Sequence, residues 1–521
     1  MIPDTTISSA TTTQPSFRIG RTYLIVLVGS LIFYIATVAP GVIWQDGGRF
    51  QVRTLRHDLY DGSEGLALSH PLHHLLTRAF QWLPIGDSAY RTNLVSAVFG
   101  ALTVTNIGLL LRLITGRWRG AIIGAIVLAV AHTFWQHCAL TEVYTVTTAL
   151  LSIELLCLQR YAQTRDSRWL IAMFAINGLN VSNHLMAGLS FGCYGILLLV
   201  LVLRKQISWR LFVIALGCWT LAGGLYWGMV LGKIMTSGNV ASTLRSAFFG
   251  SYSQKVLNTK ISIGQLKKSI LYVGLNFPTP LLLLLPVGLW SLWKSPRQLF
   301  GTVLTALLIV HLAWAVHYDV PDQYAFFILT IVLMAVVLGL GIDYFLATRP
   351  HPRSRSNWTY GVVAAALLPA LIYIPLPQLA KKANIFVGIE RPFRDGYDWF
   401  LHPYKTGDRS AEKFIAWLEE YLPPHAVLIA DDTVVRPVHY MMLTRHWRPD
   451  VTVYPTLDEP ETIPSEQQVR DALIQGRLFV VTARPGYCPD WLLENYETEP
   501  FGKMISRVTG PKPSASHPAT P

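Results

Sequence analysis

Charged side chains are scarce in this chain of 521 residues. Asp, Glu, Lys and Arg make up 14% of it, against about 25% in a typical soluble protein, whereas hydrophobic residues make up 51%. This composition excludes a soluble globular fold over most of the length. Apolar stretches of roughly 20 residues, the length that crosses a bilayer as a helix, recur along the chain. The sequence therefore predicts an all-α polytopic membrane protein.

Cysteine is also rare, and its placement excludes two kinds of site. The five cysteines are Cys138, Cys157, Cys193, Cys218 and Cys488, of which only Cys488 lies in a polar region. The polar C-terminal region therefore has no intrachain disulfide partner for its cysteine. No Cys-x-x-Cys spacing offers a metal site either.

Acidic residues are fewer than basic ones, 31 against 43, and the formal net charge is +12. A basic chain is often a nucleic-acid binder. Here, however, the Lys and Arg residues gather in short connectors between apolar stretches, which is the positive-inside pattern of membrane proteins. We therefore expect the lipid bilayer, and no nucleic acid, as a partner.

The apolar stretches and their basic connectors predict about eleven spans. Arg18 and Arg21 precede the first span, which places the N-terminus in the cytoplasm. An odd number of spans then places the C-terminal region outside, whether the membrane is a bacterial inner membrane or that of the endoplasmic reticulum. The expected spans lie near residues 23–39, 89–114, 120–134, 143–159, 169–183, 185–203, 211–234, 269–293, 299–316, 323–346 and 358–376.

Four regions follow from these patterns. We expect a disordered cytoplasmic N-terminus at 1–20, a transmembrane domain at 21–376, an extracytoplasmic domain at 377–510 and a disordered tail at 511–521. The third region reads as a small soluble α/β domain, because short buried strands alternate with amphipathic segments such as 411–421. Its expected strands lie at 425–430, 450–454 and 477–481.

One stretch, residues 70–83, is too short to span and predicts an amphipathic helix at the membrane surface. His70, His73 and His74 have the spacing that places them on one face of this helix. That spacing allows a metal site. The polar face of an amphipathic helix is the more common explanation.

Polar clusters follow four of the apolar stretches, all on the expected external side, at 44–48, 141–144, 183–184 and 317–322. Ionisable groups at a membrane boundary are costly, so their convergence on one face predicts a functional site. Asp46 stands beside Gly47 and Gly48, where its carboxylate could accept a proton from an incoming hydroxyl. Alternatively, it forms a turn with the two glycines.

Each of the other polar clusters also has two possible interpretations. Glu142 opens a returning span, where it either complements the helix macrodipole or binds substrate hydroxyls or a cation. His184 either contacts a phosphate or packs at an external turn. Asp319 and Asp322 form a second acidic cluster with His317, or they are turn residues around Pro321.

These motifs together resemble a large family of membrane proteins long called a domain of unknown function. That family includes the animal O-mannosyltransferase that modifies IPT domains, and it is similar to the GT-C glycosyltransferase superfamily. The likeness is strongest over about 35–185. It is carried by the sequences at 39–50, 69–72, 90–94, 132–135, 141–144 and 183–185, and later by those at 318–324 and 448–451.

The resemblance implies an inverting glycosyltransferase that takes its sugar, mannose in that animal relative, from a polyprenyl-phosphate donor. An acidic residue of the first external loop is the base in such enzymes, and Asp46 occupies that position. Glu142 would orient sugar hydroxyls. The remaining candidates for substrate binding are Arg49, Arg53, His70, His184, Asp319 and Asp322, with the positive groups near the departing phosphate.

Two positions depart from the family pattern. Arg49 stands where members often carry an acid, and it adds a cation that would pair with the donor phosphate. Residues 70–75 read His-Pro-Leu-His-His-Leu where the family often has His-Pro-Pro-Gly-Tyr-Pro, which changes the helix beside the donor. No residue is assigned to a metal, and a divalent ion is left open. The acceptor would be a protein hydroxyl or a glycan.

A transporter or flippase of a lipid-linked substrate is the rival reading. Such proteins tend to place ionisable sites near the bilayer midplane and to contain internal repeats. In this sequence the ionisable clusters lie at span ends, and no convincing repeat is found. A second rival is an inactive membrane scaffold that only presents the C-terminal region.

Overall fold

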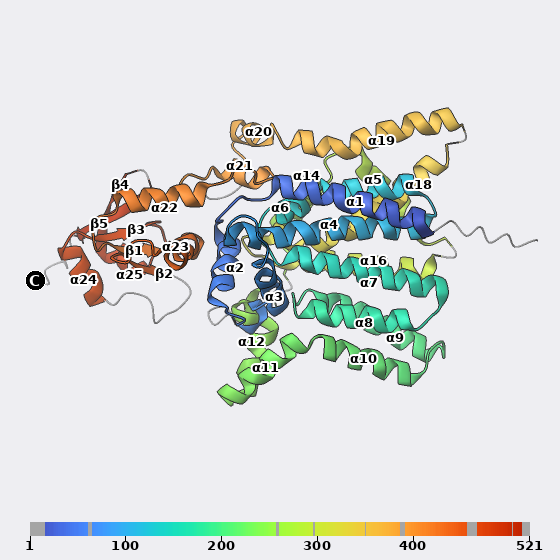
Figure 1. Cartoon of the computed structure of the whole chain (residues 1–521), viewed down its shortest axis with the longest axis horizontal. Coiled ribbons are helices and arrows are strands. Elements are labelled where there is room, and N and C mark those ends of the chain that lie inside the picture. Colours follow the sequence, from blue (N-terminus) through green and yellow to red (C-terminus); the bar gives the residue numbers. More distant parts are fainter. Residues whose placement is uncertain are drawn as a thin grey trace, which may run out of the picture.

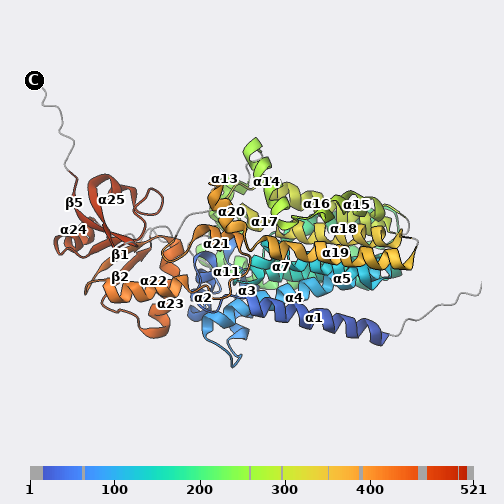
Figure 2. The ribbon, with the colours of Figure 1, turned by 90° about the horizontal axis from the view of Figure 1, so that it is seen from above.

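The computed structural model describes residues 16–60, 65–256, 260–294, 297–349, 351–385, 391–455, 466–502 and 504–512. The expected disordered ends lie mostly outside these ranges. The molecule is elongated, with a helical bundle at one end and a small sheet domain at the other (Figure 1). Helix α1, Ser16–Thr37, begins at the end of the bundle that is remote from the sheet (Figures 1 and 2).

The bundle consists of long apolar helices. Four of the described helices are long and apolar enough to cross a membrane, or up to eight spans if each bent helix pair counts as one. The chain is therefore an integral membrane protein, and every expected span overlaps a helix or a bent pair. The bundle helices are α1, α4 (Ser88–Thr115), α5 (Trp118–Ala129), α7 (Tyr144–Thr164), α8 (Arg168–Val181), α9 (Ala187–Leu203), α10 (Trp209–Ala222), α15 (Leu285–Leu292), α16 (Gln298–His317), α18 (Ile328–Ala347) and α19 (Pro352–Ile372).

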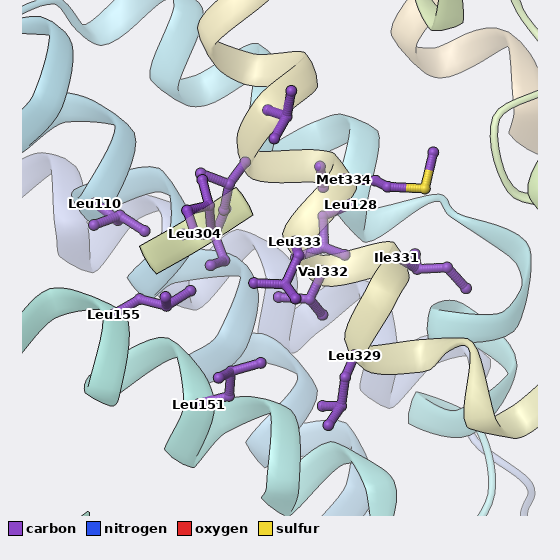
Figure 3. Close-up of a cluster of buried hydrophobic side chains, with 14 of the residues drawn as sticks. Leu110, Leu128, Leu151, Leu155, Leu304, Leu329, Ile331, Val332, Leu333 and Met334 are labelled. Atoms are coloured by element: carbon purple, nitrogen blue, oxygen red, sulfur yellow. The ribbon is translucent and has the colours of Figure 1, made fainter. Parts of the chain in front are cut away.

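Helix α18 lies at the centre of the bundle core. Its leucine, isoleucine and valine side chains are buried among side chains from α4, α5, α7 and α16 (Figure 3). Glycines allow the closest approach, because a Cβ atom on Gly124 of α5 would lie 3.0 Å from the Cα atom of Gly339 in α18. Small residues at helix contacts are the usual packing device in membranes, where lipid removes most of the hydrophobic driving force.

Several expected straight spans are bent. The span expected at 211–234 turns by 69° between α10 and α11 (Gly224–Ser237), and the one expected at 269–293 turns by 105° between α14 (Ile263–Asn276) and residues 280–292. Glycines at 223 and 224 and prolines at 278 and 280 mark these breaks. Proline removes a helical hydrogen bond and glycine weakens the helix, which explains both bends.

Short helices gather at the end of the bundle that faces the sheet domain, namely α2 (Gln45–Arg56), α3 (Pro71–Phe80), α6 (His132–Cys138), α12 (Val240–Phe249) and α17 (Gln323–Phe326). Helix α3 confirms the helix expected at 70–83. Its histidines do not form an exposed polar face, however, since His73 and His74 are buried and His73 packs edge-on against Phe50 of α2 at 4.8 Å. The contact between α2 and α3 buries the histidine face that the sequence predicts to be exposed to water.

The C-terminal region is a mixed five-stranded sheet with helices. The three expected strands are confirmed as β1 (Val427–Ala430), β2 (Thr452–Pro455) and β3 (Leu478–Val480), which pair in parallel. Two unexpected strands, β4 (Tyr496–Phe501) and β5 (Ile505–Pro511), add an antiparallel edge and give the order β2-β1-β3-β5-β4. The helices are α22 (Ser410–Tyr421), α23 (Asp432–Arg445), α24 (Glu466–Ile474) and α25 (Asp490–Asn495), together with α21 (Gly396–Leu401) before them.

The C-terminal region packs directly on the loops of the bundle. Helix α23 lies against α2, and the backbone N–H of Ala89, at the start of α4, donates to the Tyr440 hydroxyl at 2.9 Å. Trp44 and Val42 share a hydrophobic cluster with Phe414 and Leu418 of α22. The residues around Asp46 therefore lie at the joint between the two parts of the molecule.

Candidate functional site

Two cavities meet at this joint. The larger has a volume of about 640 Å³ and is mostly apolar, whereas the smaller is a polar recess of about 40 Å³. Both are lined by the same five residues, Gln45, Asp46, Glu142, Tyr144 and Asp322. The shared residues form a common wall, so that three carboxyl groups stand between the two spaces.

The structure brings together most of the residues singled out in the sequence. Asp46, Glu142 and Asp322 come from three different polar clusters, and all line the large cavity together with three further candidates. Those three are Arg49, His70 and His184.

Two expected site residues lie elsewhere. The Arg53 guanidinium donates to the backbone carbonyls of Asp58, Leu59 and Ser69, and Arg53 lines neither cavity. Asp319 also lies outside both, where its half-exposed carboxylate is 3.6 Å from Lys268. Arg53 stabilises the loop between α2 and α3, and Asp319 belongs to a half-exposed ion pair.

Asp46 is held at the start of α2 by an unusually tight turn. The preceding residue, Gln45, has a φ of 61°, a left-handed conformation that is strained for a residue other than glycine. A Cβ atom on Gly47 would lie 2.1 Å from the Ile43 side chain, and one on Gly48 would lie 2.5 Å from the Ile43 carbonyl oxygen. The two glycines are therefore required for the chain to fold back and present the exposed Asp46 side chain at the cavity wall.

Glu142 lies in the connection between α6 and α7, and its backbone is fixed by α4. Its N–H donates to the Ser96 hydroxyl at 3.0 Å, and that hydroxyl in turn donates to the Glu142 carbonyl at 3.2 Å. Burial raises the pKa of the Glu142 carboxyl well above its ordinary value, and the charges of Asp46 and Asp322 add to the rise. Glu142 therefore keeps its proton to higher pH than an exposed glutamate does.

This raised pKa gives a prediction for the pH dependence of substrate binding. Above the raised pKa, Glu142 ionises and adds a negative charge beside Asp46, which repels an anionic donor. We expect the donor KM of the wild-type protein to rise as the pH increases through the raised pKa of Glu142. The Glu142→Gln variant resembles the neutral acid and should lack this rise while keeping most of its turnover below the raised pKa. The same rise in both proteins would contradict the assignment.

The lining of the large cavity carries the groups suited to binding a phosphate. Arg49 is buried and supplies a cation to the lining of the large cavity. Nδ1 of His70 donates to the Asn183 carbonyl oxygen at 2.7 Å, and the His70 ring stacks on that of His184 at 5.0 Å. Because Asn183 offers a carbonyl oxygen there, Nδ1 of His70 is the donor.

Neither histidine carries the positive charge that the sequence suggested for His184. Burial lowers the pKa of His70 to about 3, and burial together with His70 lowers the pKa of His184 well below its ordinary value. Both rings are therefore neutral at physiological pH. The single N–H of His70 is used by the Asn183 carbonyl, whereas Nδ1 of His184 accepts from the Met186 N–H at 3.1 Å, which leaves the Nε2–H group of His184 available to a phosphate. The charge comes from Arg49.

Hydrogen bonds between α7, α8 and the residues next to them hold the backbone beside this histidine pair in place. The carboxyl of Glu154, buried within α7, accepts from Asn180 Nδ2 at 3.0 Å, and Asn180 also reaches the Thr147 carbonyl at 3.3 Å. The Asn183 side chain donates to the Thr147 hydroxyl at 2.7 Å and to the Val143 carbonyl at 2.8 Å. These bonds fix both the residue after Glu142 and the backbone that holds His70.

The remaining walls of the large cavity are aromatic. They come from α9 to α12, from α16 and α17, and from residues that directly follow α12 and α16. Small residues such as Gly188 leave the space between these rings open, since no atom lies within 4 Å of a Cβ built there. The aromatic lining residues are Phe191, Trp219, Trp227, Phe248, Phe249, Tyr252, Trp314, Tyr318 and Phe326.

The polar recess contains side chains that sequence reasoning missed. Trp399, Lys405 and Asp408, all from the segment that follows the last bundle helices, line it beside the three acids. The Lys405 ammonium donates to the carbonyls of Trp399 and His402, each at 2.6 Å. Burial lowers the pKa of Lys405 to about 7. The only sequence signal was the density of aromatic residues over 396–404, which a buried contact with the bundle explains as well.

No cluster of three or more His, Cys, Asp or Glu side chains has a metal-binding arrangement in the described part of the chain. The three wall carboxyls are thus not such a cluster.

The comparisons with known proteins add to this geometry. Residues 69–208 match the family described as protein O-mannosyl-transferase TMEM260 N-terminal domain. The resemblance seen in the motifs is confirmed over this segment. It includes Glu142 and His184, whereas Asp46 precedes it. A comparison with curated protein sequences gives no match.

Two kinds of solved structure resemble the whole chain. ArnT from Cupriavidus metallidurans, bound to undecaprenyl phosphate, aligns with a TM-score of 0.58 at 13% identity over 96% of this chain and 100% of that chain. The arabinofuranosyltransferase AftD from mycobacteria aligns with a TM-score of 0.50 at 13% identity over 94% of this chain and 40% of that chain. The chain therefore has the fold of the GT-C glycosyltransferases.

Proposed function

We propose that this protein transfers a sugar from a polyprenyl-phosphate donor to an acceptor hydroxyl. The observation that carries the proposal is the common wall of the two cavities. A large apolar space with a buried Arg49 lies on one side of Asp46, and a small polar recess lies on the other. A lipid-linked donor and a polar acceptor need these two environments, and they must meet at a group that can accept a proton.

In the proposed reaction Asp46 is the general base. The acceptor hydroxyl enters from the recess and gives its proton to the Asp46 carboxylate as its oxygen forms a bond to the anomeric carbon. The bond between that carbon and the phosphate oxygen breaks, and its electron pair leaves with the polyprenyl phosphate. In this arrangement the nucleophile would enter from the recess and the leaving group would depart into the large cavity, which is consistent with a single displacement with inversion at the anomeric carbon.

The donor side fits a phosphate attached to a long apolar chain. Arg49 would stabilise the negative charge that grows on the departing phosphate, and the Nε2–H group of His184, whose ring stacks on His70, would add a hydrogen bond. The aromatic walls would hold the polyprenyl chain. Undecaprenyl phosphate bound to ArnT, a protein of the same fold, supports this class of donor. Glu142 and Asp322 would orient the sugar hydroxyls, with mannose the sugar that the family match favours.

The acceptor side fits a small uncharged group. One water needs roughly 10–15 Å³ of cavity space, so a recess of about 40 Å³ holds only a few non-hydrogen atoms. Asp408 joins the wall acids there, and an anionic acceptor would be repelled. A serine or threonine side chain of a protein meets both conditions better than a phosphorylated glycolipid does.

We further propose that the chain crosses the membrane about eleven times, with a transmembrane domain at 21–376 and an extracytoplasmic domain at 377–510. The first helix begins at the end of the bundle remote from the sheet domain (Figure 1), which supports an odd number of crossings. Both cavities would then face the outside, where lipid-linked sugars are used by enzymes of this fold.

Reporter fusions test this orientation. A reporter that is active only outside the cytoplasm should be active when fused after Pro377 and silent when fused at Arg353. Arg353 lies in the first turn of α19, whereas Pro377 follows its C-terminal end, so the two fusions report on opposite ends of that helix. The reverse pattern would contradict the proposal, because Asp46 and Glu142 would then face the cytoplasm.

Mass spectrometry of proteins and glycolipids from cells with and without this chain tests the function itself. We expect hexose modification of particular extracytoplasmic serine or threonine residues to be lost when the chain is absent. It should return with the wild-type gene and not with an Asp46→Asn gene. Unchanged modification in all strains would contradict the proposal.

A further inference from the structure

The loop that carries Asp46 is held by the C-terminal region rather than by the bundle alone. Trp44, two residues before Asp46, is 3% exposed. Its indole N–H donates to the Ser410 hydroxyl at 2.7 Å, and its ring lies 5.7 Å from that of Phe414. Both partners belong to α22, more than 360 residues further along the chain.

Ser410 is itself fixed by a residue of the polar recess. Its hydroxyl donates to Asp408 Oδ1 at 2.7 Å, and its backbone N–H donates to the same oxygen at 3.0 Å. The hydroxyl therefore has a defined orientation, with its proton on Asp408 and its lone pair toward Trp44. Asp408 lines the recess, so a continuous set of hydrogen bonds connects the recess with the turn before Asp46.

A second contact acts on the strained residue of the same turn. The Gln45 side chain accepts a hydrogen bond from the Arg394 guanidinium at 3.4 Å, and Arg394 stacks on Trp399 at 4.2 Å. A non-glycine residue at positive φ costs about 1–3 kcal/mol and persists only where its surroundings hold it. Here those surroundings include Arg394 and α22, both outside the bundle.

We propose that Ser410 is a positioning residue for Asp46, acting through the Trp44 indole, and that the C-terminal region thereby completes the catalytic site. This inference rests on the proposed function of Asp46 as the base. Ser410 touches neither cavity, so its effect is on where the Asp46 carboxylate stands relative to the acceptor hydroxyl. Displacements of an ångström or less in such geometry reduce turnover measurably.

The test removes single hydrogen bonds between the C-terminal region and the bundle and compares the effects on kcat. Ser410→Ala should lower kcat roughly fivefold, the size expected for losing one neutral hydrogen bond, and should leave the donor KM unchanged. Trp44→Phe removes the other partner and should have a similar effect. The double variant should be no worse than either single variant, because all three lack the same bond.

Tyr440→Phe is the matched control. It removes one hydroxyl that also joins the C-terminal region to the bundle, through the Ala89 N–H, but that contact leads to α4 and not to Asp46. We expect its kcat to be normal, with any loss limited to thermal stability. Equal losses of kcat in Ser410→Ala and Tyr440→Phe, or additive losses in the double variant, would overturn the inference.

The same experiment separates this inference from the proposed function. An active wild-type protein with a fully active Ser410→Ala variant would refute the positioning role alone. A wild-type protein with no transfer activity would refute the proposed function. Thermal unfolding of each purified variant shows whether a loss of kcat comes with loss of folded protein.

Discussion

Asp46→Asn is expected to lower transfer by roughly 100-fold or more, because asparagine keeps the size and hydrogen bonding of the side chain but cannot accept the acceptor proton. The change should be measured with purified protein and a polyprenyl-phosphate sugar. Folding should be little affected. Asp46 is exposed in the first turn of α2, where its charge stabilises the helix by about 0.3–1 kcal/mol.

Asp319→Asn is the control for this substitution. Asp319 comes from the same set of external acids but lies outside both cavities, half-exposed beside Lys268. Its variant should transfer sugar at a near-normal rate. Near-normal transfer by Asp46→Asn would refute the assignment of the base and direct attention to Glu142 or Asp322.

Filling the large cavity is expected to weaken donor binding. Gly188 lines this cavity with open space where its side chain would be. Gly188→Leu would exclude about 60 Å² of apolar donor surface, which costs about 1.5 kcal/mol at ~25 cal/mol per Å² and corresponds to roughly tenfold in affinity. We expect the donor KM to rise by that factor with kcat little changed.

Gly217→Leu is the control for the Gly188→Leu substitution. Gly217 lies in α10 with equally open surroundings and lines neither cavity. Leucine in place of glycine also favours the helix in both variants, so their folding should be comparable. If both substitutions raise the donor KM equally, the large cavity is not the donor site.

Sequence patterns predicted the membrane class, the helix positions and the end of the bundle at which the polar clusters meet. Each of these depends on local composition. Long apolar stretches must be spans, and a polar cluster such as that around Asp46 or Glu142 cannot lie in the hydrocarbon, so the clusters must meet at an end of the bundle. The expected topology alone places Asp46, Glu142 and Asp322 at the same end of the bundle, where the structure has them on one wall.

The features that sequence reasoning missed depend on contacts between distant parts of the chain. Lys405 and Asp408 look like ordinary residues of a polar connection, and only the packing of that connection on the bundle makes them part of the recess. His184 looked like a cation because burial, which lowers its pKa, cannot be read from neighbours in sequence. Arg53 looked like a phosphate ligand, but its guanidinium is used by three backbone carbonyls.

The edge of the C-terminal sheet was missed for a different reason. Strand β4 carries Glu497, Thr498, Glu499 and Pro500, four exposed residues of which only the threonine favours a strand. Its partner β5 runs into the Pro-rich end of the chain. Edge strands commonly carry charge and proline, because these residues prevent pairing with other chains. The absence of an apolar pattern therefore does not exclude a strand at the edge of a sheet.

The most direct test of the account follows a labelled sugar supplied on a polyprenyl phosphate to the purified protein in lipid vesicles. We predict that the label leaves the lipid and appears on the hydroxyl of a serine- or threonine-containing acceptor, with the opposite anomeric configuration by NMR. Intact labelled lipid that has only changed leaflet would indicate a flippase. That result, or a product that retains the donor configuration, would contradict the account.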